Sequence, residues 1–337
     1  MFLEAPRSIV ILRALQFGDL LCSVPAFRAL RAAFPRARIS LVGLPWAGAF
    51  VRRFSSYLDE FIPFPGWPGL PEQEPDLQAI PSFLAAMQSR RFDLALQMQG
   101  SGTITNPLVH LFGARQAAGY HLPGQFRLNE QLNTVYPDGT PEVRVWLGLM
   151  EALGVPQQGE HLEFPVTDEE KQSFAQFLER CRLKAGSYIC LHPGARSASR
   201  RWGAEKFAAV GDALSGQGYQ IVLTGSEAER DLTQATASQM YSPVIDAAGK
   251  TDPGMLALLL ANARLLICND TGVSHLAAAV QTPSVILFNA SDPERWRPLN
   301  RSLHRAVVNA DQANYQEVLR ETDHLLKEPQ AYAGQNQ

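Results

Sequence analysis

Four short segments combine acidic, hydroxyl, basic and small residues directly after apolar runs that are typical of buried strands. They are Gly18-Asp19, 191–202 (LHPGARSASRRW), 224–231 (TGSEAERD) and 267–279 (ICNDTGVSHLAAA). In open α/β sheets, ligands bind in the crevice outside the carboxyl ends of the strands. We therefore expect the chemistry of this protein at these four turns.

The segment 191–202 has the residue types of a diphosphate site. Gly194 allows close approach of the backbone, Ser197 offers a hydroxyl, and three arginines, Arg200 among them, carry positive charge. Backbone N–H groups and guanidinium groups together bind phosphate oxygens well. A solvated basic loop is the alternative interpretation of the same residues.

The two later turns also suit a nucleotide. Glu227 could bind ribose hydroxyls, or it could be a carboxylate stabilised by the dipole at a helix N-terminus. Asp270 or Thr271 could cap a helix that opens at Gly272, and the free N–H groups of that helix would then bind an anion. His275 shares a helix face with Thr271, and it is as readily a hydrogen-bonded core residue as a ligand contact.

Asp19 likewise has two interpretations. It could cap the helix that follows, because aspartate is a favourable N-cap residue. Pro25 would then lie in the second turn and remove a hydrogen bond, whereas capping at Ser23 puts Pro25 in the first turn, where proline is tolerated. Under the second arrangement Asp19 has no capping role and can take a proton from a ligand.

The elements that position these turns alternate along the chain. Apolar runs such as SIVILRA, ARISLVG and FDLALQM predict strands, and amphipathic segments between them predict helices at 20–34, 46–57, 76–90, 103–113, 140–154, 168–183, 204–216, 227–240, 253–261, 272–280 and 312–326. Such alternation predicts parallel βαβ units. We expect an α/β fold of two doubly wound Rossmann-like domains, 1–155 and 156–337, with the last helix able to pack back on the first domain.

Composition narrows the function classes. The 337 residues are 46% apolar and 19% charged with a net charge of -3. This is typical of a globular protein and gives no sign of a surface that binds nucleic acid.

Residues 1–155 contain arginine but no lysine; this suits an anionic ligand, or it reflects codon usage. The four cysteines lack metal-ligand spacing and are expected to be reduced core residues. No signal peptide or membrane span is predicted, so a cytoplasmic location is expected.

Several motifs are missing from the sequence. There is no GxGxxG after the first strand, no GxxxxGK[ST], no GxSxG and no HExxH, so hydride transfer, P-loop chemistry, α/β-hydrolase chemistry and zinc proteolysis lose support. There is also no acidic DxD pair at a strand end to hold a metal. The segment 63–75 has five prolines and two glycines and predicts a surface loop that can contact a ligand.

The chain resembles a known family in six ordered motifs. They are LQFGDLLCSVPAFRALRAAFPRARISLV, QMQGSG, GARQAAGY, LHPGARSASRRW, TGSEAER and NDTGVSHLAAAV, and they are similar to those of glycosyltransferase family 9, the bacterial ADP-heptose:lipopolysaccharide heptosyltransferases. The resemblance covers most of the chain. It implies the GT-B architecture, in which an N-terminal acceptor domain and a C-terminal nucleotide-sugar domain have sheets that face across a cleft. It also implies inverting transfer with neither metal nor cofactor.

The resemblance assigns roles to particular residues. It implies that Asp19 is the catalytic base and that the donor is bound by Ser197, Arg200, Glu227, Asp270, Thr271, Gly272 and His275. Candidate acceptor contacts are Gly18, Gln99, Arg52 and Arg115. Two positions depart from the family pattern, because Arg200 stands where lysine is common and Gln97 stands where an acid is common.

The expected partners are a nucleotide-sugar donor, ADP-heptose in the first place, and an anionic glycolipid or glycan such as the lipopolysaccharide core. Peripheral contact with the inner face of the cytoplasmic membrane is compatible with such an acceptor. Two alternatives remain at this point: a nucleotide-sugar epimerase on the same fold, and a non-catalytic relative that binds a nucleotide or glycan.

Overall fold

The computed structural model describes residues 5–312 and 314–327. The chain divides into two compact units, Met1–His161 and Leu162–Gln337, and each is described by itself. The division falls shortly after the boundary expected at 155/156.

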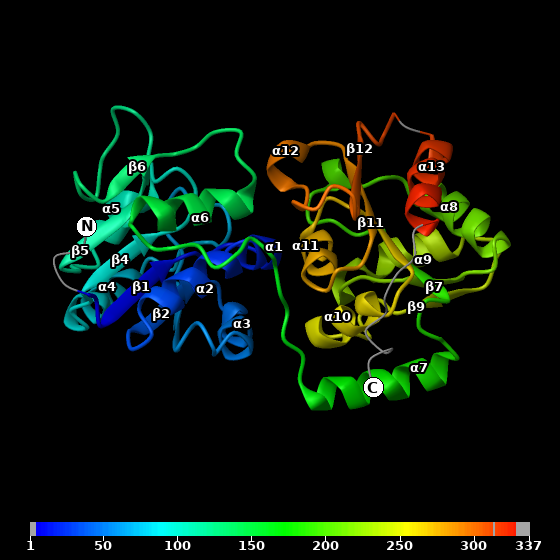
Figure 1. Cartoon of the computed structure of the whole chain (residues 1–337), viewed down its shortest axis with the longest axis horizontal. Helices are drawn as coiled ribbons and strands as arrows, with labels where there is room; N and C mark the ends of the chain where they lie inside the picture. The colour runs from blue at the N-terminus through cyan, green and yellow to red at the C-terminus, as the bar shows by residue number, and fades with distance from the viewer. Residues whose placement is uncertain (1–4, 313, 328–337) are drawn as a thin grey trace. The chain divides into compact units, whose positions relative to one another are not determined.

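The first unit is built on a six-stranded sheet with the order β3-β2-β1-β4-β5-β6 (Figure 1). All its neighbouring strands run parallel. The strands are β1 (Ser8–Leu12), β2 (Arg38–Gly43), β3 (Glu60–Pro63), β4 (Leu94–Gln97), β5 (Gln116–His121) and β6 (Asn133–Val135). The helices are α1 (Phe17–Leu21), α2 (Val24–Ala33), α3 (Ala47–Arg53), α4 (Ala79–Ser89), α5 (Thr105–His110) and α6 (Glu142–Ala152).

The helix expected at 20–34 is two helices in the structure. Ser23 is the N-cap residue of α2, and Pro25 lies in the first turn of that helix. Proline is tolerated there because the first-turn N–H groups have no partner within the helix. The second of the two arrangements weighed for Pro25 is therefore confirmed.

The proline-rich segment is a loop, as predicted. It follows β3, which is an edge strand, where the missing N–H of Pro63 costs little. The loop closes on itself, since the backbone N–H of Asp76 donates to the Pro65 carbonyl at 2.8 Å. Gly66 has a φ of +82°, and a Cβ there would lie 2.7 Å from the Cα of Pro75, so this turn requires glycine.

The second unit repeats the topology of the first. Its parallel sheet has the order β12-β11-β10-β7-β8-β9. The strands are β7 (Tyr188–His192), β8 (Gln220–Leu223), β9 (Val244–Asp246), β10 (Leu265–Asn269), β11 (Ser284–Phe288) and β12 (His304–Val308). The helices are α7 (Asp168–Cys181), α8 (Ala204–Gly216), α9 (Arg230–Ala237), α10 (Pro253–Ala261), α11 (Gly272–Ala279), α12 (Pro293–Trp296) and α13 (Tyr315–Leu326), with two short 3-10 turns, η1 (Ala198–Arg200) and η2 (Glu227–Glu229).

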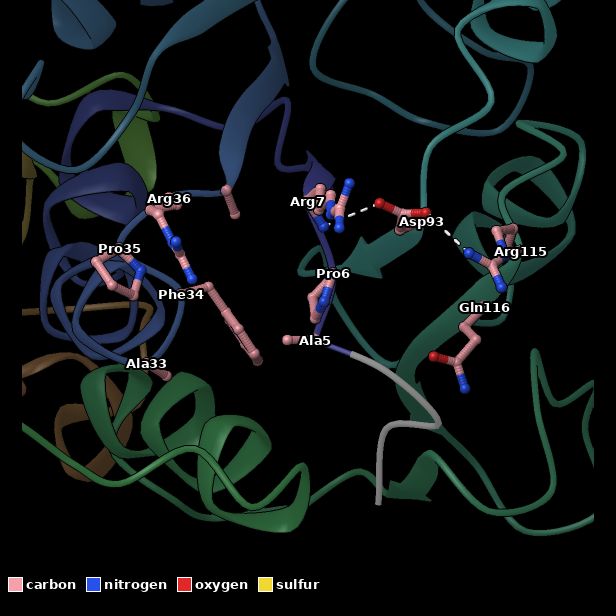
Figure 2. A pocket seen from close by; sticks show the side chains of 11 residues that line it. Ala5, Pro6, Arg7, Ala33, Phe34, Pro35, Arg36, Asp93, Arg115 and Gln116 are labelled. Atoms are coloured by element: carbon pink, nitrogen blue, oxygen red, sulfur yellow. Dashed lines mark hydrogen bonds and ion pairs between the residues drawn. The ribbon is translucent and has the colours of Figure 1, made fainter.

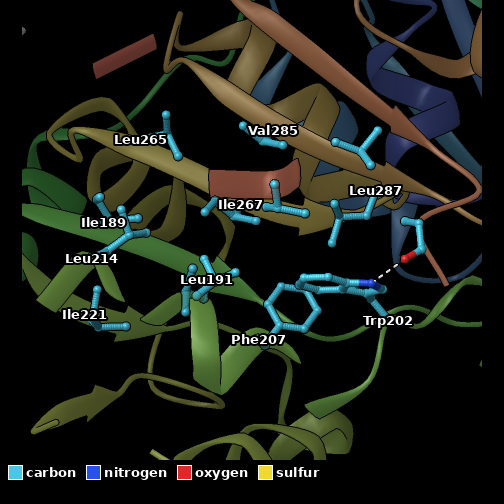
Figure 3. Packing of buried hydrophobic residues seen from close by; sticks show 14 of the residues in the cluster. Ile189, Leu191, Trp202, Phe207, Leu214, Ile221, Leu265, Ile267, Val285 and Leu287 are labelled. Carbon is cyan, nitrogen blue, oxygen red and sulfur yellow. Dashed lines mark hydrogen bonds between the residues drawn. The ribbon is translucent and has the colours of Figure 1, made fainter. Parts of the chain in front are cut away.

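One hydrophobic core cluster of the second unit lies between its sheet and the helices α8 and α13. Branched side chains from the central strands pack against Trp202 and Phe207, whose ring centroids are 5.3 Å apart (Figure 3). The Trp202 indole N–H donates to the Ala310 carbonyl at 2.5 Å. The buried face of α13, with Val318 and Leu325, belongs to this same core.

Each sheet has a topological switch point, where the strand order reverses. It lies between β1 and β4 in the first sheet and between β7 and β10 in the second. Ligands of doubly wound folds bind outside the carboxyl ends of the strands at such points. The two doubly wound Rossmann-like sheets expected from the sequence are confirmed, and the site must be sought after these four strands.

Candidate active site

Asp19 lies at the switch point of the first sheet, in the first turn of α1. Gln16 is the N-cap residue, and its backbone N–H donates to Asp19 Oδ2 at 3.2 Å in a reciprocal capping box. The expectation that Asp19 has no capping role is therefore wrong, because α1 is a separate short helix whose third residue reaches back to its own start. The Asp19 side chain is nevertheless partly exposed, while Gly18 beside it is buried.

Gln99 lies at the same edge of the sheet, after β4. Its Oε1 accepts a hydrogen bond from the Ala14 N–H at 2.8 Å, which fixes the orientation of the amide. Its Nε2 is buried and has no hydrogen-bond partner among the described residues. Gln97 instead serves the fold, since its Nε2 donates to the Gln99 carbonyl and to Thr105 Oγ1.

Two buried residues that were not identified from the sequence, Arg13 and Glu142, support the Asp19 turn. The guanidinium of Arg13 donates to the carbonyl oxygens of Asp19 and Met98, and it forms an ion pair with Glu142 at 3.0 Å. Arg13 is 0% exposed and Glu142 is 2% exposed. Nothing in the local sequence pairs these residues, because 129 positions separate them.

The two candidate acceptor arginines lie in different places. Arg52 is exposed in the last turn of α3, and its Nη1 extends back toward Gly48 in the first turn of that helix. Arg115 directly precedes β5, at the amino end of the sheet, and pairs with Asp93 at 3.4 Å. Figure 2 shows Arg115 and Asp93 beside Arg7, around a surface pocket at that end. The structure thus does not bring Arg115 to the edge that holds Asp19 and Gln99.

The switch point of the second sheet brings several predicted donor residues together. Arg200 Nη1 lies 3.6 Å from Asp270 Oδ2, and Ser291 Oγ donates a hydrogen bond to the same carboxylate oxygen. Asp270 is 3% exposed, whereas the Arg200 side chain is 42% exposed. Ser291, which follows β11, was not identified from the sequence.

Asn269 fastens the 191–202 segment to the end of β10. Its Oδ1 accepts from the Trp202 N–H at 2.9 Å, and its Nδ2 donates to the Pro193 carbonyl at 2.8 Å. The segment is therefore held at both ends by one neutral side chain. Between these ends Ser197 is exposed, and its hydroxyl lies 2.8 Å from that of Ser199.

Helix α11 begins at this switch point. Thr271 is its N-cap residue with extended backbone, and within the described chain its side chain makes no capping hydrogen bond. The helix then starts at Gly272, and its first N–H groups lie beside the Asp270 turn. His275 is buried one turn later, with its ring centroid 6.4 Å from that of Trp296.

The two glutamates after β8 differ in what they contact. Glu227 is exposed, and its Oε2 accepts from Arg230 at 2.6 Å. Glu229 accepts from the Ser226 N–H at 2.8 Å and lies beside Gly194, where an added Cβ would be 2.2 Å from Glu229 Oε1. It is Glu229 rather than Glu227 that contacts the 191–202 segment.

Glu229 also lies 4.0 Å from the buried ring of His192. Burial lowers the pKa of His192 more than the neighbouring Glu229 raises it, so the ring is held neutral. Its Nδ1 is 3.0 Å from Thr224 Oγ1. The sequence analysis identified Glu227, at the start of the helix, but not Glu229. The signal that would have identified Glu229 is its capping-box spacing from Ser226.

Two kinds of feature are absent from the residues that the structure describes. No group of three histidine, cysteine or acidic side chains is placed to hold a metal ion. Within the same described ranges, no helix has both the length and the apolar character needed to cross a membrane.

Comparisons with known proteins show which family the chain is similar to. Residues 80–326 match the model of glycosyltransferase family 9 (heptosyltransferase). Lipopolysaccharide heptosyltransferase 3 of Escherichia coli strain K12 is 25% identical over 313 residues, which cover 89% of this chain and 87% of that protein.

Two solved structures have the same fold. The family 9 glycosyl transferase of Veillonella parvula superimposes with a TM-score of 0.79 at 21% identity, over 98% of this chain and 99% of that one. The ADP-heptose lps heptosyltransferase II of E. coli gives 0.74 at 22% identity, over 95% and 98%. The fold is thus that of the GT-B heptosyltransferases, and because the family model matches most of its length, the chain belongs to glycosyltransferase family 9 and is a glycosyltransferase enzyme.

Proposed function

We propose that this enzyme transfers a heptose from ADP-heptose to the lipopolysaccharide core or a similar glycan, with inversion at the anomeric carbon and without a metal ion. One observation carries the proposal: each sheet has a polar site at its switch point, one around a carboxylate and the other around an exposed arginine. The relatives named as lipopolysaccharide heptosyltransferases support the choice of sugar and acceptor. In this proposal the first unit holds the acceptor and the second holds the donor.

Asp19 is the proposed general base. As the acceptor oxygen bonds to the anomeric carbon, its proton passes to the Asp19 carboxylate, and the bond to the diphosphate oxygen breaks on the opposite face. The carboxylate is partly exposed, and the Gln16 N–H holds it through Oδ2. General-base assistance of this kind contributes about a hundredfold to ten-thousandfold in rate.

The second unit stabilises the departing diphosphate. Arg200 is exposed enough to turn from Asp270 toward a phosphate, and Ser197 is exposed on the same segment. The first N–H groups of α11 at Thr271-Gly272 add donors that favour negative charge. These groups supply the positive potential that a metal ion would otherwise provide. His275 and Glu227 complete the proposed donor contacts.

Acceptor recognition is assigned to the edge around Asp19. The buried Nε2 of Gln99 is a hydrogen-bond donor suited to an acceptor hydroxyl, and Gly18 has no side chain to block approach. Arg52, in the last turn of α3, is an exposed cation that suits an anionic acceptor group. Arg115 is left out because it lies at the other end of the strands. A lipid-linked acceptor would bring the enzyme to the inner face of the cytoplasmic membrane, where we propose that it acts.

The direct test is a transfer assay with ADP-heptose and lipopolysaccharide core acceptor in the presence of EDTA. We expect the product to carry the inverted anomeric configuration by NMR, and we expect ADP to raise the melting temperature more than UDP, GDP or CMP. A preference for UDP or GDP would overturn the donor, and activity that requires added Mg²⁺ would overturn metal independence. Isomerised donor without acceptor would indicate an epimerase, and nucleotide binding without turnover would indicate a non-catalytic relative.

A further inference from the structure

One buried guanidinium joins the two turns of the first switch point. Arg13 directly follows β1 and is 0% exposed. Its Nε and Nη2 donate to the carbonyl oxygen of Asp19 at 3.1 and 2.7 Å, and its Nη1 donates to that of Met98 at 2.5 Å. The turn that holds Asp19 and the turn that leads to Gln99 are therefore tied to a single rigid group.

The charge of Arg13 is compensated from α6. Glu142, the first residue of that helix, pairs with Arg13 Nη2 at 3.0 Å and accepts from the Trp146 indole at 2.8 Å. The guanidinium carbon also lies 4.5 Å from the centroid of the Trp146 ring. A buried cation persists only when it is paired and hydrogen-bonded in this way, so Glu142 and Trp146 compensate the charge of the guanidinium and fix its position.

A second tie runs parallel to the first. The N–H of Ala14, next to Arg13, donates to Gln99 Oε1 at 2.8 Å. Gln97 in turn donates to the Gln99 carbonyl, which supports the second turn from below. The distance between the Asp19 turn and the Gln99 side chain is thus set by the hydrogen bonds of Arg13 and Ala14 and not by loop packing alone.

We propose that Arg13 is a positioning residue for the transfer reaction. It holds Asp19 and Gln99 in the relative placement that lets one take the proton while the other orients the acceptor. This inference rests on the proposed function of Asp19. A displacement of about 1 Å at a reacting group can cost about a hundredfold in rate, so the loss of this tie should appear in kcat.

Arginine is the suitable residue for this task. Its planar fork donates in fixed directions to two carbonyls and a carboxylate at once, whereas lysine presents a single ammonium on a flexible stem. A purely structural role predicts something different, namely that activity follows stability. The two roles are separated by a variant that restores stability without restoring the bonds to Asp19 and Met98.

That variant is Arg13→Met combined with Glu142→Gln. It removes both buried charges together, so it avoids the strong destabilisation of an unpaired Glu142, and glutamine still offers Trp146 an acceptor oxygen. Tyr120→Phe is the matched control, since it deletes a buried hydrogen bond to the Val145 carbonyl in the same unit and keeps the aromatic ring that lies 5.9 Å from that of Trp146. Kinetics and melting temperatures of all variants are measured at a temperature at which each is folded.

We expect the double variant to melt above the single Arg13→Met variant but to have kcat lowered by about tenfold to a hundredfold, with the KM for the donor within about twofold of wild type. Tyr120→Phe is expected to keep the wild-type kcat. A double variant with wild-type kcat, or a kcat that follows melting temperature across all variants, overturns the inference. If the double variant does not fold, Arg13→Lys decides: a lowered kcat supports the inference and an unchanged kcat overturns it.

The failure of this inference can be told apart from failure of the proposed function. Asp19→Asn is assayed in the same series. If it is inactive while the Arg13 variants are fully active, only the positioning role is lost. If Asp19→Asn is itself active, the proposed base is wrong, whatever the Arg13 variants do.

Discussion

The two switch points stand on the same strand order, yet they use arginine in opposite ways. In the first unit Arg13 is 0% exposed, and its N–H groups donate to carbonyl oxygens and to Glu142. In the second unit the Arg200 side chain is 42% exposed and pairs with Asp270 at 3.6 Å, beyond ordinary hydrogen-bond length. One arginine holds the backbone of its site, and the other remains available to an anion.

The two units also differ in the residue that holds the turns at the strand ends together. In the second unit this task falls to the neutral Asn269, which bonds to Trp202 and Pro193. Because Asn269 makes these bonds, Arg200 is not needed for them, and its side chain stays 42% exposed. We propose that identical topology supports a proton-accepting site in the first unit and an anion-binding site in the second, depending on where the charge is buried.

The largest expected effect is that of Asp19→Asn on kcat. Asparagine keeps the shape of the side chain and an oxygen for the Gln16 N–H, but it cannot take a proton at neutral pH. We expect kcat to fall by about a hundredfold to ten-thousandfold with little change in melting temperature. Steady-state rates at saturating donor and acceptor check this, and a kcat within a few fold of wild type would remove Asp19 as the base.

The next effect concerns the second site. Hydrogen bonds to charged groups contribute about 1.5–3 kcal/mol, so Arg200→Ala should raise the donor KM by about tenfold to a hundredfold. Arg200→Lys is the matched variant, and it should lose less because it keeps the charge. An Arg200→Ala enzyme with wild-type donor KM would break the contrast between the two arginines.

An acid-sensitive group also distinguishes the second unit. Burial, with a further contribution from His275, lowers the pKa of His304 to about 3. Below about pH 6.5 the His304 imidazole takes up a proton in the unfolded chain but not in the folded chain. The free energy of unfolding therefore falls as the pH falls from about 6.5 to about 3, by up to about 1.4 kcal/mol per pH unit. His304 Nδ1 lies 2.7 Å from Ser284 Oγ, and the amide of an asparagine can still bond to that hydroxyl. Urea titrations at a series of pH values should therefore show that the free energy of unfolding of His304→Asn depends less steeply on pH. An equal slope would contradict the assignment.

The smallest effect is expected for Arg115→Ala. Its ion pair with Asp93 is 3.4 Å long and exposed, and it lies at the amino end of the first sheet. Exposed pairs of this kind contribute about 0–1 kcal/mol, so both melting temperature and acceptor KM should stay near wild type, within about twofold for KM. Arg52→Ala is the comparison, and a larger acceptor effect at Arg115 than at Arg52 would return Arg115 to the acceptor site.

Local patterns predicted most of the fold. The helices at 204–216 and 253–261 have the expected bounds, because apolar periodicity and clear end signals coincide there. The strands β5, β6 and β12 were not predicted, since small, short or polar segments form them and neighbouring strands decide their pairing.

The candidate site was predictable only in part. Asp270, Thr271 and Gly272 follow a buried strand, and such turns can be recognised from sequence. The partnership of Arg13 with Glu142 joins positions far apart in the chain, and no local pattern contains it. Glu229 was overlooked because its neighbour Glu227 stands at the helix start, while only packing against Gly194 shows which of the two contacts the 191–202 segment.

The central claim is that the second unit binds the donor nucleotide and the first unit holds the base. Calorimetric titration of ADP into wild type, Asp19→Asn and Arg200→Ala tests it most directly. This measurement does not require the acceptor to be known. The account predicts that Asp19→Asn binds ADP as wild type does and that Arg200→Ala binds it at least about tenfold more weakly. Weakened binding in Asp19→Asn together with unchanged binding in Arg200→Ala would contradict it.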